Sequence, residues 1–297
     1  MAHLLLPITS GLAEGMILVL VASGLALTFG VMRIVNMAHG GFLMLGAFLF
    51  YSFTRALGTS IAAFVASLVL SGISVGIVGA LAESTIYRRL YGRDPLAGLL
   101  GTFALLLLFE GAVPVIWGNQ PLATNIAKPL QDTELHISDV GLPLYDFIPI
   151  GVGAALLVIL GLGLYRTELG LRTRSVGRDR DMAGLLGLNV RRIFLGTFVL
   201  GCVMAGLAGA LLAPTISLDS TLGSTYIVLA FAVLLVGGLG SLRGTVIAGL
   251  LLGLLDSVIA FYSPQVGGYT IYIAMIVVLL FRPSGLFAIG GHDDVHL

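Results

Sequence analysis

The sequence predicts an all-α fold, a polytopic bundle of about eight or nine membrane-spanning helices, and two observations lead to it. Of the 297 residues, 58% are hydrophobic and only 10% are charged, with a mean hydropathy of +1.07. Soluble globular chains carry about a quarter charged residues, so this chain has too little polar surface to face water on all sides. The apolar residues also form long uninterrupted runs. Only helices or closed barrels span lipid, and runs this long and uniform are typical of helices.

Each expected span is an apolar stretch near the roughly 20 residues that cross a hydrocarbon core of about 30 Å. The stretches fall at about 11–31, 40–57, 60–82, 96–117, 146–165, 193–213, 225–240, 245–262 and 269–281. The last one is short and follows Ser263 and Pro264, which indicates a re-entrant or partial span. The chain lacks a basic start, so we expect its first apolar run to be a membrane helix and not a cleaved signal. We expect residues 1–297 to form one transmembrane domain.

The composition argues against several classes of site and partner. Net charge is zero and the basic residues are not gathered into one patch, so no nucleic-acid partner is expected. Cys202 is the only cysteine, which excludes an intramolecular disulfide. No spacing of His or carboxylates suits a metal, and no glycine-rich lysine motif suits a nucleotide. We therefore expect no catalytic residue, no metal and no cofactor in this chain.

Arginines mark the loops that we expect on the cytoplasmic side, because such loops carry an excess of basic residues. Seven arginines crowd residues 166–192, and three lie in the turn at 83–95. The segment 118–145 has Lys128 as its single base and is rich in Pro and Gly, and 214–224 has no base. We expect these two on the outside. Alternation then places the N-terminus outside and the C-terminus in the cytoplasm, which favours nine spans.

Within the basic loop 166–192, the sequence predicts a short amphipathic helix. Asp179 or Asp181 can cap its start, and Gly187 can end it in a left-handed conformation that glycine adopts at little cost. Its apolar face would be formed by Met182, Leu185 and Leu186. A helix of about two turns is not stable alone in water, so this face needs a surface to rest on. Lipid headgroups are one such surface, and a cytoplasmic partner that receives the helix as a coupling element is another.

Polar groups at membrane depth are candidates for a solute pathway because they are costly in lipid. The candidates are Asn36, His39, Gly40, Glu110 and Asp256. Asn36 and His39 lie three apart and would share a helix face, and the glycines after them permit an unwound backbone. Such backbone lines a cavity or is buried in protein. A simple turn capped by Asn36 is the alternative, and Glu110 and Asp256 stay open between structural and pathway roles.

A faint internal repeat is visible at the end of the first span. Residues 29–33 resemble residues 239–243, since both contain a glycine, end in arginine and precede a glycine-rich span. Many transporter folds are built from repeats. Glycine-rich apolar sequence also matches itself by chance, so the repeat is a hypothesis.

The stretches Asp181-Met182-Ala183-x-x-x-Gly187 and Asn36-Met-Ala-His-Gly40 resemble motifs of the branched-chain amino acid permease family of ABC importers. Asp181-Met182-Ala183-x-x-x-Gly187 is similar to the Glu-Ala-Ala-x-x-x-Gly motif of such permeases, with Asp for Glu and Met for the first Ala. The segment 36–40, Asn-Met-Ala-His-Gly, looks like the family's Asn-Phe-Ala-His-Gly, although Gly41 follows where the family often has an acid. Further similar segments, in the family's order, are 43–47, 235–241 and 280–287.

The resemblance implies an ABC importer permease in the bacterial inner (plasma) membrane. It would move branched-chain or other amino acids, or related small polar solutes such as amides or urea, into the cell by alternating access. The implied partners are a second related permease subunit or a copy of this chain, two cytoplasmic ATPases that use ATP, and a periplasmic solute-binding protein. The loop 118–145 would be periplasmic and 166–192 the coupling loop. The implied coupling helix comprises Asp181, Met182, Ala183, Leu185, Leu186 and Gly187.

Two other functions stay open from the residues. A proton-driven secondary transporter could use Glu110 or Asp256 and would need no ATPase, but it gives the loop 166–192 no necessary role. An intramembrane enzyme has less support, because Ser23 lacks the preceding glycine of a Gly-x-Ser-Gly motif. The histidines other than His39 also lie outside the expected spans.

Overall fold

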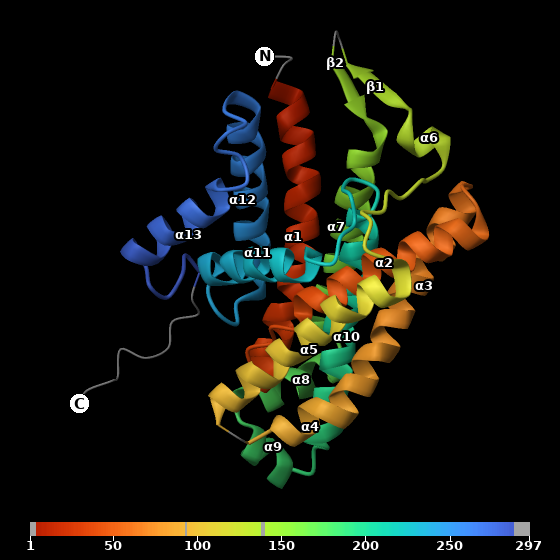
Figure 1. The fold of residues 1–297 in the computed structure, drawn as a ribbon. Helices are drawn as coiled ribbons and strands as arrows, with labels where there is room; N and C mark the ends of the chain where they lie inside the picture. The colour runs from red at the N-terminus through yellow and green to blue at the C-terminus, as the bar shows by residue number, and fades with distance from the viewer. Residues whose placement is uncertain (1–3, 93, 138–139, 288–297) are drawn as a thin grey trace.

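The computed structural model describes residues 4–92, 94–137 and 140–287, and it is built almost wholly of helices (Figure 1). The longer helices, in chain order, are α1 (Leu5–Met32), α2 (His39–Leu57), α3 (Ile61–Ala82), α5 (Pro95–Trp117), α7 (Phe147–Arg166), α8 (Glu168–Arg178), α10 (Val190–Leu212), α11 (Leu222–Gly237), α12 (Leu242–Tyr262) and α13 (Thr270–Phe281). The short elements are the π-helix η2 (Glu83–Tyr87), α4 (Arg88–Leu90), α6 (Lys128–Gln131), β1 (Glu134–Ile137), β2 (Val140–Pro143), the 3-10 helix η3 (Leu144–Asp146) and α9 (Arg180–Leu185). The predicted all-α transmembrane bundle is confirmed.

Seven helical segments within the described residues are long and apolar enough to cross a membrane, and α11 and α13 are shorter apolar helices. With 16 residues at a rise of 1.5 Å, α11 is about 24 Å long and falls short of a core of about 30 Å. The stretch expected at 225–240 is present as this helix, which begins and ends three residues earlier. The 12 residues of α13 agree with the partial span expected at 269–281. In Figure 1, α11 runs across α1 and not alongside it.

The helix α1 forms the centre of the bundle and is buried along most of its length, packed against α12, α10, α7 and α11. Glycines allow these close contacts, as is usual where no hydrophobic force drives helices together in lipid. A Cβ added to Gly15 would lie 3.0 Å from the carbonyl oxygen of Gly249 on α12. The pair α2 and α10 is as close, because a Cβ on Gly209 would overlap the carbonyl oxygen of Leu43.

The two loops expected on the outer side are joined to each other. Leu122 and Leu218 exchange backbone hydrogen bonds of 3.0 and 2.8 Å, which pairs the loop after α5 with the loop after α10. The loop after α5 continues into the antiparallel hairpin β1–β2. Figure 1 shows this hairpin at the opposite end of the molecule from α9.

The turn expected at 83–95 is shorter than predicted. The helix α3 continues through η2 and α4 to Leu90 without a break, so most of the expected turn is helical. Arg93, one of its three expected arginines, lies outside the described residues. The π-helical turn begins at Glu83, a fully buried carboxylate that the sequence interpretation had placed in a loop.

Candidate functional site

The basic loop 166–192 folds as two helices, α8 and α9, of which only α9 was predicted. The Asp179 side chain caps α9 by accepting hydrogen bonds from the backbone N–H groups of Asp181 (3.0 Å) and Met182 (2.9 Å). Gly187 ends the helix with a positive φ of 84°, and the N–H of Leu188 bonds to the Ala183 carbonyl. This pattern is a Schellman end, in which glycine removes the cost of the left-handed turn. Both ends of α9 are therefore fixed by local chemistry.

The helix α8 was missed, although the sequence carries its start signal. The Thr167 hydroxyl accepts a hydrogen bond from the Gly170 N–H at 3.1 Å, and Glu168 stands in the first turn, where an acid suits the helix dipole. A threonine followed by an acid could have predicted this helix. Because α8 lies directly between α7 and α9, it attaches the short helix to the bundle.

The outer face of α9 is apolar and uncovered. Leu185 and Leu186 are 83% and 76% exposed, and Met182 is more than half exposed. These three residues lie at positions i, i+3 and i+4, hence on one face. Ala183, on the side of the helix next to this face, is buried. An isolated exposed leucine is ordinary, but here three exposed apolar side chains lie together on one short, doubly capped helix.

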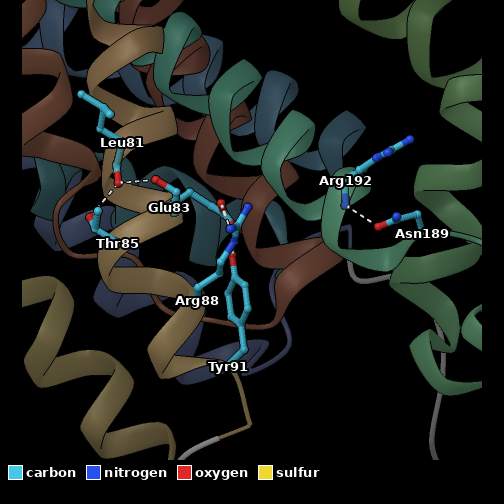
Figure 2. A network of polar contacts seen from close by, with 8 residues as sticks. Leu81, Glu83, Thr85, Arg88, Tyr91, Asn189 and Arg192 are labelled. Carbon is cyan, nitrogen blue, oxygen red and sulfur yellow. Dashed lines mark hydrogen bonds and ion pairs between the residues drawn. The ribbon is translucent and has the colours of Figure 1, made fainter.

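A polar network lies beside α9 and is built on the π-helix η2 (Figure 2). The buried Glu83 carboxylate accepts a hydrogen bond from the Tyr91 hydroxyl at 3.0 Å, and it lies 3.5 Å from Nε of Arg88. The spacing of five residues brings Arg88 back to the side of Glu83 because a π-helix bonds residues i and i+5. Burial raises the pKa of Tyr91 above its usual range, and the Glu83 carboxylate raises it further, so the phenol stays a donor.

This network reaches the basic loop 166–192. A cavity of about 380 Å³ is lined by Arg88 and Tyr91 together with Arg180 and Asp181 of α9, among others. The Tyr91 ring also packs edge-on against Phe194 of α10, with centroids 5.2 Å apart. Sequence reasoning missed Glu83, Tyr87 and Tyr91. The signal that could have found them is an acid followed five residues later by an arginine at the end of a span.

Asn36 and His39 lie at a buried joint between α1 and α2. The Tyr87 hydroxyl of η2 donates a hydrogen bond to Oδ1 of Asn36, and Nε2 of His39 lies 3.1 Å from the Val21 carbonyl. Nδ2 of Asn36 and Nδ1 of His39 are buried and have no hydrogen-bond partner within the described part of the chain. Neither residue lines any of five cavities in the described part, and both side chains are buried. The joint is thus enclosed by protein in this conformation.

A residue of α5 holds the irregular backbone of this joint. The Thr102 hydroxyl accepts a hydrogen bond from the Met37 N–H and donates one to the Val35 carbonyl, both at 3.1 Å. Irregular backbone at membrane depth needs such partners because lipid offers none. Thr102 was not singled out from the sequence, since one hydroxyl in an apolar run gives no local signal.

The remaining candidates take part in helix packing and capping. Oε1 of Glu110 accepts the backbone N–H of Ser224 at 2.8 Å, so a carboxylate of α5 caps the start of α11. Gly40 lies at the same place, because a Cβ there would overlap the Gly223 carbonyl oxygen. Asp256 lies elsewhere, on α12, and accepts the Gly268 N–H at 3.0 Å. The structure therefore brings Gly40 and Glu110 together at the start of α11 and keeps Asp256 apart.

Comparison with known proteins gives a consistent result. The family model described as "Branched-chain amino acid transport system / permease component" matches residues 8–280. The chain is 30% identical over 298 positions to the high-affinity branched-chain amino acid transport system permease protein BraD of Pseudomonas aeruginosa, covering 96% of this chain and 95% of the relative. It is 28% identical over 282 positions to a probable branched-chain amino acid transport permease protein LivH of Methanocaldococcus jannaschii, covering 91% and 88%.

One solved structure has a similar fold. PsaBC from Streptococcus pneumoniae in complex with Fab aligns with a TM-score of 0.50, at 17% identity, over 94% of this chain and 91% of that chain. At this level of identity the likeness concerns the fold alone.

Proposed function

The chain belongs to the branched-chain amino acid permease family of ABC importers, and from this premise we propose that it moves amino acids inward by alternating access, driven by ATPases that dock on α9. The observation that carries the proposal is the doubly capped helix α9 with its uncovered apolar face. A short helix such as α9 can transmit movement to the bundle only if both of its ends are attached to other helices. One end joins α8 and the other leads into α10, which packs on α1, α2 and α3.

The proposed orientation places α9 and its arginines in the cytoplasm and the hairpin β1–β2 outside. A periplasmic solute-binding protein would then dock at the hairpin end, with two ATPases at the α9 end. A second permease subunit, related or identical, would complete the complex. The N-terminus would be outside and the C-terminus cytoplasmic. Branched-chain amino acids are the proposed solutes, with other amino acids, amides and urea as further members of the same chemical range.

The proton-driven alternative has less support. Glu110 and Asp256 were its expected carriers, and both carboxylates accept backbone N–H groups at helix ends or turns. Both carboxylates therefore have a structural role in holding a helix start or a turn, which a transport role is not needed to explain.

Crosslinking tests the docking surface. Leu185→Cys should form an adduct with an ATPase subunit when the complex, purified from its native membrane in mild detergent, is treated with a maleimide–succinimide crosslinker that joins the thiol to a lysine amine. The native Cys202 does not interfere, because it is fully buried. Leu135→Cys on the hairpin is the matched control, since it is also exposed but lies at the other end of the molecule (Figure 1). Absence of an adduct at every position from 179 to 189 would contradict docking on α9.

The buried joint gives a second test. Asn36→Ala and His39→Ala should each slow uptake several-fold while the complex still assembles, because the joint between α1 and α2 must flex when the bundle rocks. Asn36→Ala should also cost about 1–3 kcal/mol, since it leaves the Tyr87 hydroxyl buried without its acceptor. Uptake of labelled leucine into vesicles holding the whole complex measures the first effect, and thermal melting the second. Wild-type uptake rates in both variants would mean that the joint is a simple turn with no role in transport.

A further inference from the structure

A basic cavity of the described chain has no function in the transport model. It measures about 530 Å³ and lies where the end of α1, the end of α7, α8 and the start of α12 meet. Arg174, Arg178 and Arg243 line it, and its lining contains no acidic side chain. None of the three forms an ion pair with a carboxylate within 4.0 Å in the described residues. Three positive charges around one hollow favour an anion.

Two of these arginines stack on the same aromatic ring. The guanidinium carbons of Arg174 and Arg243 lie 5.2 and 5.6 Å from the centroid of the Tyr165 ring. The ring attracts each cation, but the two cations repel each other. Arg174 comes from α8 and Arg243 from α12, so an anion between them would bind two separate elements. Arginine presents planar forked donors that match a phosphate or carboxylate.

The walls of the cavity are apolar and continue beyond it along the bundle. Inside, the apolar lining is formed by Ala26, Leu27, Val31, Leu164 and Leu242. From Arg243 an exposed stripe runs along α12 through Ile247, Leu251 and Leu255, each four residues further. From Tyr165 another exposed stripe runs back along α7 through Leu162 and Val158. Both helices are candidate membrane spans, so both stripes lead from the arginines toward the middle of the bilayer.

We propose that this cavity binds one anionic phospholipid. Its phosphate lies between Arg174 and Arg243, and its acyl chains follow the stripes on α7 and α12. The arginines of this pocket suit the phosphate of a lipid, and its apolar walls and stripes suit the acyl chains. A free phosphate would contact only the arginines. The leaflet is the cytoplasmic one if the proposed orientation holds, and the site itself does not depend on the transport proposal.

The bound lipid would join the coupling loop to the core. Its headgroup would bridge α8, which carries α9, to α12, which packs on α1. The two faintly repeated segments, 29–33 and 239–243, meet in this cavity, where a Cβ on Gly30 would lie 4.0 Å from the Cα of Gly240. The lipid would thus sit where the end of α1 and the start of α12 approach each other.

Native mass spectrometry of the purified chain tests the proposal. The chain is mixed with equal amounts of dioleoylphosphatidylglycerol and dioleoylphosphatidylcholine. One phosphatidylglycerol should be retained in preference to phosphatidylcholine by about thirtyfold, from roughly 1 kcal/mol for each of the two arginines. The Arg174→Gln/Arg243→Gln variant should lose this preference. Arg55→Gln/Arg89→Gln, which removes the same charge at two exposed sites outside the cavity, should keep it.

Several outcomes would overturn the assignment. They are equal retention of the two lipids, an equal loss in both double variants, or a second copy of the chain bound in place of lipid. Glycerol phosphate that displaces the lipid at comparable concentration would show a soluble phosphate site instead. Because the Gln variant could misfold, Arg174→Lys/Arg243→Lys is run beside it. It keeps the charges and should retain a preference for phosphatidylglycerol, and failure to do so in a folded protein would also contradict the proposal.

Discussion

Gly209→Val is expected to abolish the folded bundle, whereas Gly196→Val in the same helix is expected to be tolerated. Gly209 packs its Cα against the backbone of α2, and even a single added carbon would overlap the Leu43 carbonyl oxygen. Backbone cannot rotate away as a side chain can. The cost should therefore reach or exceed the upper end of the roughly 1–3 kcal/mol typical of overpacking. Gly196 has nothing within 4 Å of an added Cβ.

The measurement is the monodisperse fraction of each tagged variant on size-exclusion chromatography in mild detergent. Gly209→Val should run as aggregate or be degraded, and Gly196→Val should match the parent. The neighbouring contact gives an independent check, because a Cβ on Gly46 of α2 would overlap the Gly206 carbonyl oxygen of α10. Gly46→Val should fail as Gly209→Val does. Two well-behaved variants would mean that α2 and α10 do not cross at these glycines.

Arg88→Ala is expected to destabilise the protein by leaving a buried carboxylate without its cation. Breaking a fully buried pair costs about 3–5 kcal/mol, and we expect about 2–3 kcal/mol here because Arg88 is 29% exposed and Tyr91 still donates to Glu83. The melting temperature of the purified chain should fall by several degrees. Uptake should fall further than stability alone explains, since the network borders the cavity beside α9.

A double variant separates the charge effect from lost packing. Glu83→Gln/Arg88→Ala removes the carboxylate together with its cation, so it should recover much of the stability that Arg88→Ala loses. The introduced glutamine can still accept the Tyr91 hydrogen bond through its amide oxygen. If the double variant is no more stable than Arg88→Ala, the arginine contributes through its aliphatic stem and not through its charge.

The sequence predicted most of the fold because a long apolar run has only one solution in lipid. It did not predict that α11 starts at Leu222, because a helix that starts inside the bundle needs a partner for its first N–H groups. That partner, Glu110, comes from another helix. In a hydropathy profile Glu110 counts only as an unfavourable charge. The π-helix after α3 was missed for a similar reason, since Glu83 and Arg88 are typical of a loop until packing buries them.

Some parts of the candidate site depend on local sequence signals and could be predicted, whereas others depend on tertiary contacts and could not. The helix α9 was predicted because its signals, the Asp179 cap and Gly187, are local. Asn36 and His39 could not be assigned, since the same residues suit an open pathway and a closed turn. The deciding partners, Tyr87 and Thr102, lie far along the chain. Their role in solute passage therefore stays a prediction that the uptake assays test.

The central position of α1 has a consequence for how the chain is made. This helix is synthesised long before α12, yet the glycines on its packing face, Gly11 and Gly15, meet Gly249 and Gly253 on α12. Contacts of such high contact order form late. During membrane insertion the packing face of α1 therefore contacts lipids or insertion factors until α12 has been synthesised. A nascent chain released before Leu242 would keep its first helix without its main neighbour, a substrate for membrane quality control.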